Sequence, residues 1–409
     1  MSILPESTKN IVLPKMYKIE QIFPNKKIDD VYAGAYNEIA NKNIDKLITE
    51  GESVAILVGS RGISGLKEVV KATVDQLIRI GAKPFIVPAM GSHGGGVAKE
   101  QRAIVENFGV TEEFLGIPIK SAMDTIIIGK TDQGVAIHID KIASEADHIV
   151  PIVRVKQHTD FDGPIESGLC KMLSIGLGKH NGCATLHKEG FVNFNKLIPE
   201  VGDFVIKNRS IPFGMAIVEN AHENVHTVKL VYGNEILQEE PKLLELSKSL
   251  MPRLYFDHID VLIVEQIGKD ITGAGMDPNI TGRSSLGRSE YFTGPTITRI
   301  VALGLSEGTH NNANGVGYAD FITKALYEDI DFVSTYTNGI AAGSPTACNI
   351  PVFLDTEKEA ILAALQTCPR VEPSDAKIVR IKDTLHLVEI EVSESLYKQC
   401  KLDDRFKIS

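Results

Sequence analysis

The residues best suited to chemistry gather between positions 154 and 191, in a segment that reads RVKQHTDFDGPIESGLCKMLSIGLGKHNGCATLHKEGF. Three histidines, His158, His180 and His187, lie there among lysines, glycines and a cysteine. Imidazole acts as a general base near neutral pH and binds nickel, zinc or copper. The segment follows a continuous apolar run, and α/β proteins place ligands beyond the carboxyl ends of buried strands. The pattern therefore predicts a catalytic or metal-binding site.

Lys171 lies within an apolar stretch of this segment, which predicts that it lies on, or opens, a short buried helix. An unpaired buried ammonium is costly, so such a lysine reaches water, pairs with a carboxylate, or is neutral and reactive. Two interpretations stay open from the residues alone. Lys171 either holds a neighbouring carboxylate such as Glu166, or it has a functional role.

Two further candidates follow the first two predicted strands. Arg61 comes after the apolar run SVAILV and could bind a carboxylate or phosphate with two hydrogen bonds. His93 lies in the loop GSHGGG, whose glycines allow the backbone to approach a ligand closely. The alternatives are a surface arginine and a turn histidine without a task. The chain has no G-x-x-x-x-G-K-[ST] phosphate loop and no G-x-G-x-x-G fingerprint after its first strand.

The elements that position these residues alternate between strands and helices. Such an order predicts an α/β fold, with an N-terminal domain whose mainly parallel sheet is flanked by helices. We expect a second, smaller α/β domain and a cleft between the two. The boundary falls near Met251, which gives domains 1–251 and 252–409. The expected elements of the first domain are a helix over 29–48, strand 53–58, helix 66–80, strand 84–88, helix 98–107, a hairpin of 124–129 with 134–138, strand 146–155, helix 191–208, strand 214–219 and helix 239–250.

The second domain carries two glycine-rich loops of its own, at 268–279 and 309–320. The expected elements there are strand 261–266, helix 318–327, helix 358–365, and strands 377–381 and 386–392.

The composition excludes several classes of protein. A formal net charge of -10 argues against nucleic-acid or anionic-membrane partners, whose footprint is a basic stripe. No apolar run approaches the roughly 20 residues that span a bilayer, and the start of the chain does not read as a signal peptide. The five cysteines are scattered and contain no C-x-x-C pair, which is typical of reduced thiols. We therefore expect a cytoplasmic protein.

Taken in order, these candidates resemble the nickel-dependent lactate racemase family. The resemblance lies in the order and spacing of Arg61, His93, His158, Lys171 and His187. It covers the chain well to about residue 220 and the remainder loosely. The family resemblance implies a racemase or epimerase that inverts C2 of a 2-hydroxy acid by hydride transfer to and from a nickel-pincer nucleotide.

The resemblance also implies the role of each residue. Lys171 would carry the covalently attached cofactor, and His187 would bind its nickel. His93 and His158 would exchange protons with the substrate, and Arg61 would orient the substrate carboxylate or the cofactor phosphate. Proteins that make the cofactor would be partners of this chain.

Departures from the family pattern point away from lactate as the substrate. Where the lactate enzymes carry an acidic residue three positions before the arginine, this chain has Val58. The interval from His158 to Lys171 is a few residues longer. Lys324 matches a substrate-side lysine of the second domain, while the glutamine expected near it falls on Phe321. We expect a different 2-hydroxy acid, such as a larger sugar acid.

Two alternatives from other functional classes remain. The first is a zinc-dependent hydrolase or lyase, with His158, His180 and His187 around the metal and Glu166 or Asp162 as the base. The second is a non-catalytic protein that binds an anionic ligand through Arg61 and the glycine-rich loops.

Overall fold

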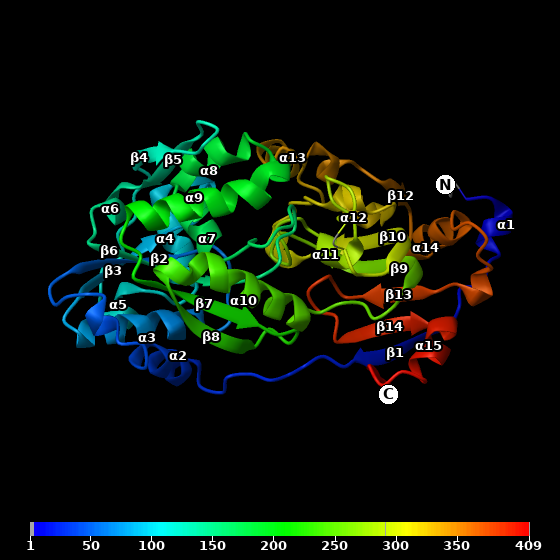
Figure 1. Cartoon of the computed structure of the whole chain (residues 1–409). Coiled ribbons are helices and arrows are strands. Elements are labelled where there is room, and N and C mark those ends of the chain that lie inside the picture. Colours follow the sequence, from blue (N-terminus) through cyan, green and yellow to red (C-terminus); the bar gives the residue numbers. More distant parts are fainter. Residues whose placement is uncertain (1–3, 291, 409) are drawn as a thin grey trace. The chain divides into compact units, whose positions relative to one another are not determined.

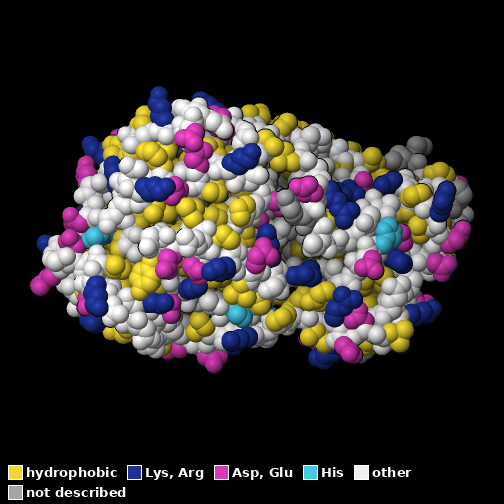
Figure 2. All heavy atoms as spheres, in the orientation of Figure 1, with side chains coloured by type: hydrophobic (Ala, Val, Ile, Leu, Met, Phe, Trp, Pro, Cys, Tyr) yellow, Lys and Arg dark blue, Asp and Glu magenta, His cyan; other side chains and the backbone are white. Residues whose placement is uncertain are grey.

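The computed structural model describes residues 4–290 and 292–408, which form two compact units. One unit runs from Asn25 to Met251, and the other joins the segment ending at Pro24 to the segment starting at Pro252. Both units are α/β, with helices packed on mainly parallel sheets (Figure 1), so the expected fold class is confirmed. Figure 2 shows acidic and basic side chains interspersed on the face it presents.

The unit from Asn25 to Met251 contains a five-stranded sheet in the order β3-β2-β6-β7-β8. The first four strands are parallel and β8 is antiparallel to β7. Strands β4 and β5 form a separate antiparallel hairpin, as expected around TDQG. The strands are β2 (Ser53–Val58), β3 (Lys83–Pro88), β4 (Thr125–Lys130), β5 (Ala136–Asp140), β6 (His148–Arg154), β7 (Phe213–Glu219) and β8 (Val225–Tyr232). The helices are α2 (Val31–Ala40), α3 (Leu66–Arg79), α4 (Ala98–Asn107), α5 (Glu112–Leu115), α6 (Lys141–Ser144), α7 (Leu169–Lys171), α8 (Lys179–His187), α9 (Phe194–Asn208) and α10 (Ile236–Leu250).

Helices cover both faces of this sheet, which explains why its strands read as continuous apolar runs. Along β2, Val54 and Ile56 belong to the core shared with α2 and α3. Ala55 and Leu57 point the other way, into the core shared with α9 and α10. Side chains alternate between the two faces of a strand, so SVAILV supplies both cores at once. None of the helices within residues 4–290 and 292–408 is long and apolar enough to cross a bilayer.

The other unit is built on an eight-stranded sheet in the order β12-β11-β10-β9-β13-β14-β1-β15. The strands from β12 to β13 are parallel, and β14, β1 and β15 continue the sheet in antiparallel pairs. The strands are β1 (Met16–Gln21), β9 (His258–Ile267), β10 (Thr296–Leu305), β11 (Phe321–Thr323), β12 (Val352–Leu354), β13 (Ile378–Ile381), β14 (Glu389–Ser393) and β15 (Phe406–Ile408). The helices are α1 (Glu6–Lys9), α11 (Pro278–Thr281), α12 (Lys324–Glu328), α13 (Phe332–Ala341), α14 (Glu357–Gln366) and α15 (Glu394–Cys400).

Three expectations are wrong. The first domain does not begin at residue 1, because β1 pairs with β14 and β15 in the sheet of the other unit. The helix expected over 318–327 starts only at Lys324, because Phe321–Thr323 forms a strand between β10 and β12. The helix expected over 29–48 covers only Val31–Ala40, followed by a short 3₁₀ turn. Strands β8 and β10 have no counterpart among the expected elements.

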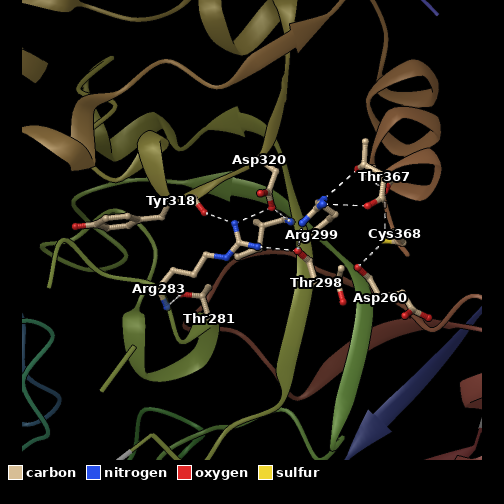
Figure 3. Close-up of polar contacts among 11 residues, drawn as sticks. Asp260, Thr281, Arg283, Thr298, Arg299, Tyr318, Asp320, Thr367 and Cys368 are labelled. Atoms are coloured by element: carbon tan, nitrogen blue, oxygen red, sulfur yellow. Dashed lines mark hydrogen bonds and ion pairs between the residues drawn. The ribbon is translucent and has the colours of Figure 1, made fainter. Parts of the chain in front are cut away.

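Arg283 and Asp320 fasten the loop after α11 to the parallel strands of the second sheet (Figure 3). The guanidinium donates to the carbonyl oxygens of Tyr318 (3.0 Å) and Thr298 (3.1 Å), and its Nη1 lies 2.7 Å from Asp320 Oδ2. The same carboxylate oxygen accepts the backbone N–H of Ile300 at 2.7 Å. One carboxylate therefore satisfies a strand amide and orients the arginine.

In the unit from Asn25 to Met251, a buried ion pair lies where α8 begins. Lys179 has a fully buried side chain and a left-handed backbone (φ 52°). Its Nζ lies 3.1 Å from Asp140 Oδ2, donates to the carbonyl oxygen of Pro88, and lies 3.5 Å from Gln101 Oε1. Burial lowers the pKa of Lys179 and raises that of Asp140, because each charge has lost its water. The pair joins the ends of β3 and β5 to α8.

We predict that Asp320→Ala lowers the free energy of unfolding by about 1–3 kcal/mol, because it leaves the Ile300 amide and the Arg283 guanidinium short of an acceptor. Urea denaturation followed by circular dichroism measures the change. The matched control is Asp404→Ala, which removes an exposed aspartate from the same unit. Equal stabilities of the two variants would contradict the prediction.

We predict a larger loss for Lys179→Met, about 3–5 kcal/mol, because the variant leaves the buried Asp140 carboxylate without its cation. The double variant Lys179→Met/Asp140→Asn should recover part of this loss. In the wild-type protein, Asp140 Oδ1 accepts the backbone N–H of Ala143 at 2.7 Å. The asparagine removes the charge but keeps an oxygen that can accept the same hydrogen bond. A double variant no more stable than Lys179→Met would refute the charge argument.

Candidate functional site

The candidate site of the unit from Asn25 to Met251 is built on the carboxyl ends of three neighbouring parallel strands. Arg61 follows β2, the loop containing His93 follows β3, and His158 follows β6. Because these strands are parallel, their loops emerge at the same edge of the sheet, as expected. Lys171 and His187 follow later in the chain, on α7 and at the end of α8.

Lys171 ends the short helix α7, and the chain continues directly into a π-helical turn, Met172–Gly176. Such wide turns are uncommon and are frequent at functional sites. Glu240 of α10 holds the start of this segment, since its Oε2 accepts the backbone N–H of Cys170 at 2.9 Å. Burial raises the pKa of Glu240 to about 8. A Cβ at Gly168 would lie 2.0 Å from Glu240 Oε1, so the contact requires glycine there.

Within the described residues, the ammonium of Lys171 has neither a hydrogen bond nor an ion pair. Its Nζ lies 5.9 Å from the ring centre of Phe161. Burial lowers the pKa of Lys171 to about 8, assisted by the positive charge of Arg61 and opposed by Asp160. Glu166 does not hold this lysine, because its carboxylate lies 3.0 Å from Lys248 Nζ instead.

Arg61 is likewise without a hydrogen bond or ion pair among the described residues. Its side chain reaches solvent. Nearby protein atoms and the positive charge of Arg154 lower its pKa, and Asp160 acts in the opposite direction. Arg154 itself is paired with Glu219. Arg61 is therefore a guanidinium whose donors are available to an anion.

His158 is enclosed by cations and aromatic rings. Its Nδ1 accepts the backbone N–H of Asp160 at 3.0 Å, and its ring centre lies 4.4 Å from that of Phe161. Burial and then the charges of Lys171 and Arg61 hold the pKa of His158 well below its ordinary value. His158 is thus neutral near pH 7.

His187 is oriented by its own helix. Its Nδ1 lies 2.7 Å from the carbonyl oxygen of Cys183, so Nδ1–H donates and, in the neutral ring, Nε2 has the lone pair. A hydrogen bond of this kind to the second nitrogen is what orients a metal-binding imidazole. Burial opposes charge on His187, but contact with the Cys183 thiol outweighs it and raises the pKa of His187. The same contact lowers the pKa of Cys183 against the effect of burial.

Three phenylalanines join these groups. The rings of Phe191 and Phe194 meet His187 edge-on at 5.3 and 5.1 Å between centres. The ring centres of Phe161 and Phe194 are 5.4 Å apart, and the Phe161 ring also packs on His158. The rings form an apolar surface beside the imidazoles and the Lys171 amine. Phe161 comes from the interval between His158 and Lys171.

His93 is exposed, and two side chains hold it from different elements. Ser60 Oγ lies 2.5 Å from His93 Nδ1. The buried side chain of Gln101, on α4, donates to the carbonyl oxygens of Gly91 (2.9 Å) and His93 (3.0 Å). The next residues, Gly94 to Gly96, all have positive φ, a backbone that side chains rarely adopt. The neighbouring Ser92 hydroxyl lies 3.5 Å from Cys183 Sγ, which links this loop to the His187 helix.

Ring contacts with Phe161 and Phe191 thus bring His158, Lys171 and His187 together. The charge of Arg61 acts on His158, and Ser60 and Ser92 connect His93 to this group. Lys324 belongs to the other unit, where it opens α12 and lies 3.6 Å from Glu328. Its proposed role stays a prediction.

The zinc site of the alternative hydrolase or lyase, with His158, His180 and His187 as ligands, is not formed among the described residues. Among residues 4–290 and 292–408, no three His, Cys, Asp or Glu side chains are grouped so that they could hold a metal ion. His180 is exposed beside the loop at Gly96, and Glu166 is fully engaged by the His158 N–H (2.6 Å) and Lys248. A single histidine ligand, His187, remains compatible with a metal whose other ligands come from a cofactor.

Several residues of the site have no strong signal in the sequence. Glu240 and Gln101 lie on helices whose polar residues read as solvent-facing, yet both are fully buried. Lys179 reads as one more lysine of the central segment. Only Ser60 had a usable signal, because it directly precedes Arg61 on the same loop.

Known proteins share the fold of this chain and part of its sequence pattern. Residues 3–238 match the family model of the lactate racemase N-terminal domain. The lactate racemase apoprotein from Thermoanaerobacterium thermosaccharolyticum is similar in structure, with a TM-score of 0.55 and 14% sequence identity over 91% of this chain and 99% of that one. A structural genomics protein from Thermotoga maritima has a TM-score of 0.54 and 14% identity, covering 89% and 99% of the two chains. No curated protein sequence matches.

At 14% identity the two structures show a common fold, and they do not show a common activity or substrate. The family model is more informative, because it covers more than half of the chain and includes Arg61, His93, His158, Lys171 and His187. This chain therefore belongs to the lactate racemase N-terminal domain family.

Proposed function

We propose that this protein is a racemase or epimerase that inverts C2 of a 2-hydroxy acid, with a nickel-pincer nucleotide attached to Lys171. One observation carries the proposal. Among the described residues, Arg61 and Lys171 are cations without hydrogen bonds or ion pairs, and both lower the pKa of the neutral His158. A site of this kind is suited to an anionic substrate and a covalently held group.

The residues fit the cofactor. An amine with a pKa of about 8 has an appreciable uncharged fraction at neutral pH, and only the uncharged form is a nucleophile. The Nε2 of His187 keeps a lone pair for nickel, and the three phenylalanine rings offer an apolar surface to a planar ring. When bound, the nickel-pincer nucleotide supplies a two-electron acceptor for the hydride.

The chain's own residues supply binding, orientation and proton transfer. Arg61 binds the substrate carboxylate with two parallel hydrogen bonds. The C2 hydrogen is barely acidic, because the neighbouring carboxylate disfavours a carbanion, so it leaves with its electron pair. A histidine takes the hydroxyl proton in the same step, which leaves a neutral ketone beside the carboxylate. His93 and His158 serve the two mirror-image substrates from opposite sides.

We propose a 2-hydroxy acid larger than lactate, such as a sugar acid. Val58, which replaces the acidic residue of the lactate enzymes, is a fully buried strand residue and offers no polar group to the substrate. Racemisation of lactate and of nothing larger would refute this part of the proposal.

The first test uses protein from a host that makes the cofactor. A tryptic peptide containing Lys171 should carry the mass of the nucleotide, with nickel near one equivalent per chain. Lys171→Ala should lose the added mass and all turnover, whereas Lys99→Ala, an exposed lysine on α4, should retain both. Turnover that survives in Lys171→Ala would refute the proposal. If cofactor-loaded wild-type protein shows no turnover but binds an anionic ligand, the alternative of a non-catalytic binding protein would be favoured instead.

The second test measures the Lys171 amine in cofactor-free protein. Acetylation of Lys171 by a limiting amount of reagent should rise with pH and level off above about pH 8, because the neutral amine is the reactive form and the folded-state pKa is about 8. Acetylation at Lys99 in the same digest corrects for hydrolysis of the reagent. A midpoint near pH 10 would show that burial does not depress the pKa of this lysine.

A further inference from the structure

Ser60 contacts His93 from a different loop. It lies after β2, directly before Arg61, whereas His93 lies after β3. Its Oγ is 2.5 Å from His93 Nδ1. Gln101 already fixes the backbone on this side through the carbonyl oxygens of Gly91 and His93. With the backbone held, the partner of Nδ1 influences how the ring is turned and which nitrogen carries the proton.

The three histidines of the site have chemically different partners at Nδ1. A carbonyl oxygen, that of Cys183, faces Nδ1 of His187 and can only accept, so Nε2 has a lone pair. A backbone N–H, that of Asp160, faces Nδ1 of His158 and can only donate, so neutral His158 carries its proton on Nε2. The hydroxyl of Ser60 faces Nδ1 of His93 and is able to accept as well as to donate.

We infer that Ser60 is a positioning residue for His93, and that it accepts a hydrogen bond from Nδ1–H and thereby keeps Nε2 ready to take the substrate's hydroxyl proton. This inference rests on the proposed function for its catalytic consequence. The same hydrogen bond is made by the neutral ring and by the imidazolium, so it persists while Nε2 gains and loses its proton. In the resting protein Nε2 of His93 then has a lone pair and Nε2 of His158 an N–H, so His158 can take a proton at Nε2 only in its other tautomer, without the hydrogen bond from the Asp160 N–H.

The test needs no cofactor. Nitrogen-15 spectra of histidine-labelled protein report the tautomer of each ring, and the signals of His93 are those missing from His93→Gln. The expected spectrum of neutral His93 is that of the Nδ1–H tautomer. In Ser60→Ala it should move toward the Nε2–H form, which free imidazole side chains prefer, and Ser60→Thr should restore the wild-type spectrum because it keeps the hydroxyl. Wild-type His93 in the Nε2–H form, or unchanged shifts in Ser60→Ala, would overturn the inference.

Cofactor-loaded protein tests the catalytic consequence. Ser60→Ala should lower kcat by about 10–100-fold with KM within about threefold, the range typical of residues that orient a working imidazole, and Ser60→Thr should recover most of kcat. The matched control is Ser64→Ala, which removes a hydroxyl from the same loop. The substitution leaves the hydrogen bond from the backbone N–H of residue 64 to Glu219, at 2.6 Å, in place. A normal kcat in Ser60→Ala would refute the catalytic role. Loaded wild-type enzyme without racemase activity would refute the proposed function, while the tautomer experiment would still decide the contact.

Discussion

The buried ammonium of Lys179 is the interaction on which the candidate site depends most. It bridges Asp140 at the end of β5, the carbonyl oxygen of Pro88 at the end of β3, and Gln101 on α4. The chain from Pro88 leads into the His93 loop, and α8 leads from Lys179 to His187. This cation therefore joins the loop that would handle protons to the helix that would hold the metal, beside the contact between Ser92 and Cys183. Because the pair is fully buried, salt in the solvent screens it little.

The second constraint is charge. Arg61 and Lys171 lie near His158 and Arg154, and Asp160 is the carboxylate that opposes them. Protein interiors rarely hold cations without partners, since removing a charge from water is costly. Here burial and the neighbouring positive charges lower the pKa of Lys171 to about 8 and keep His158 neutral, which reduces that cost. An anion entering the site would meet donors that the fold has left unsatisfied.

Much of this could be predicted from the sequence, for definite reasons. The run at Ser53–Val58 is apolar throughout because both faces of β2 are covered, and the order of strands and helices placed Arg61, His93 and His158 on one edge of a parallel sheet. The contribution of β1 to the other sheet could not be predicted, because its partner strands β14 and β15 are more than 350 positions away and local patterns carry no pairing information. Nor could the partners of the site be predicted, since Glu240, Gln101 and Lys179 are polar residues whose burial appears only when distant elements pack.

The position of β1 has a consequence for how the chain is made. Met16 pairs with Ser393, so this strand cannot find its neighbour until residue 393 has left the ribosome. The unit from Asn25 to Met251, by contrast, contains all the strands of its own sheet and is complete long before that. During synthesis the candidate site would therefore assemble first, while residues 16–21 wait for a partner. Closing so long a loop is entropically slow, which makes docking of this strand the natural final step of folding.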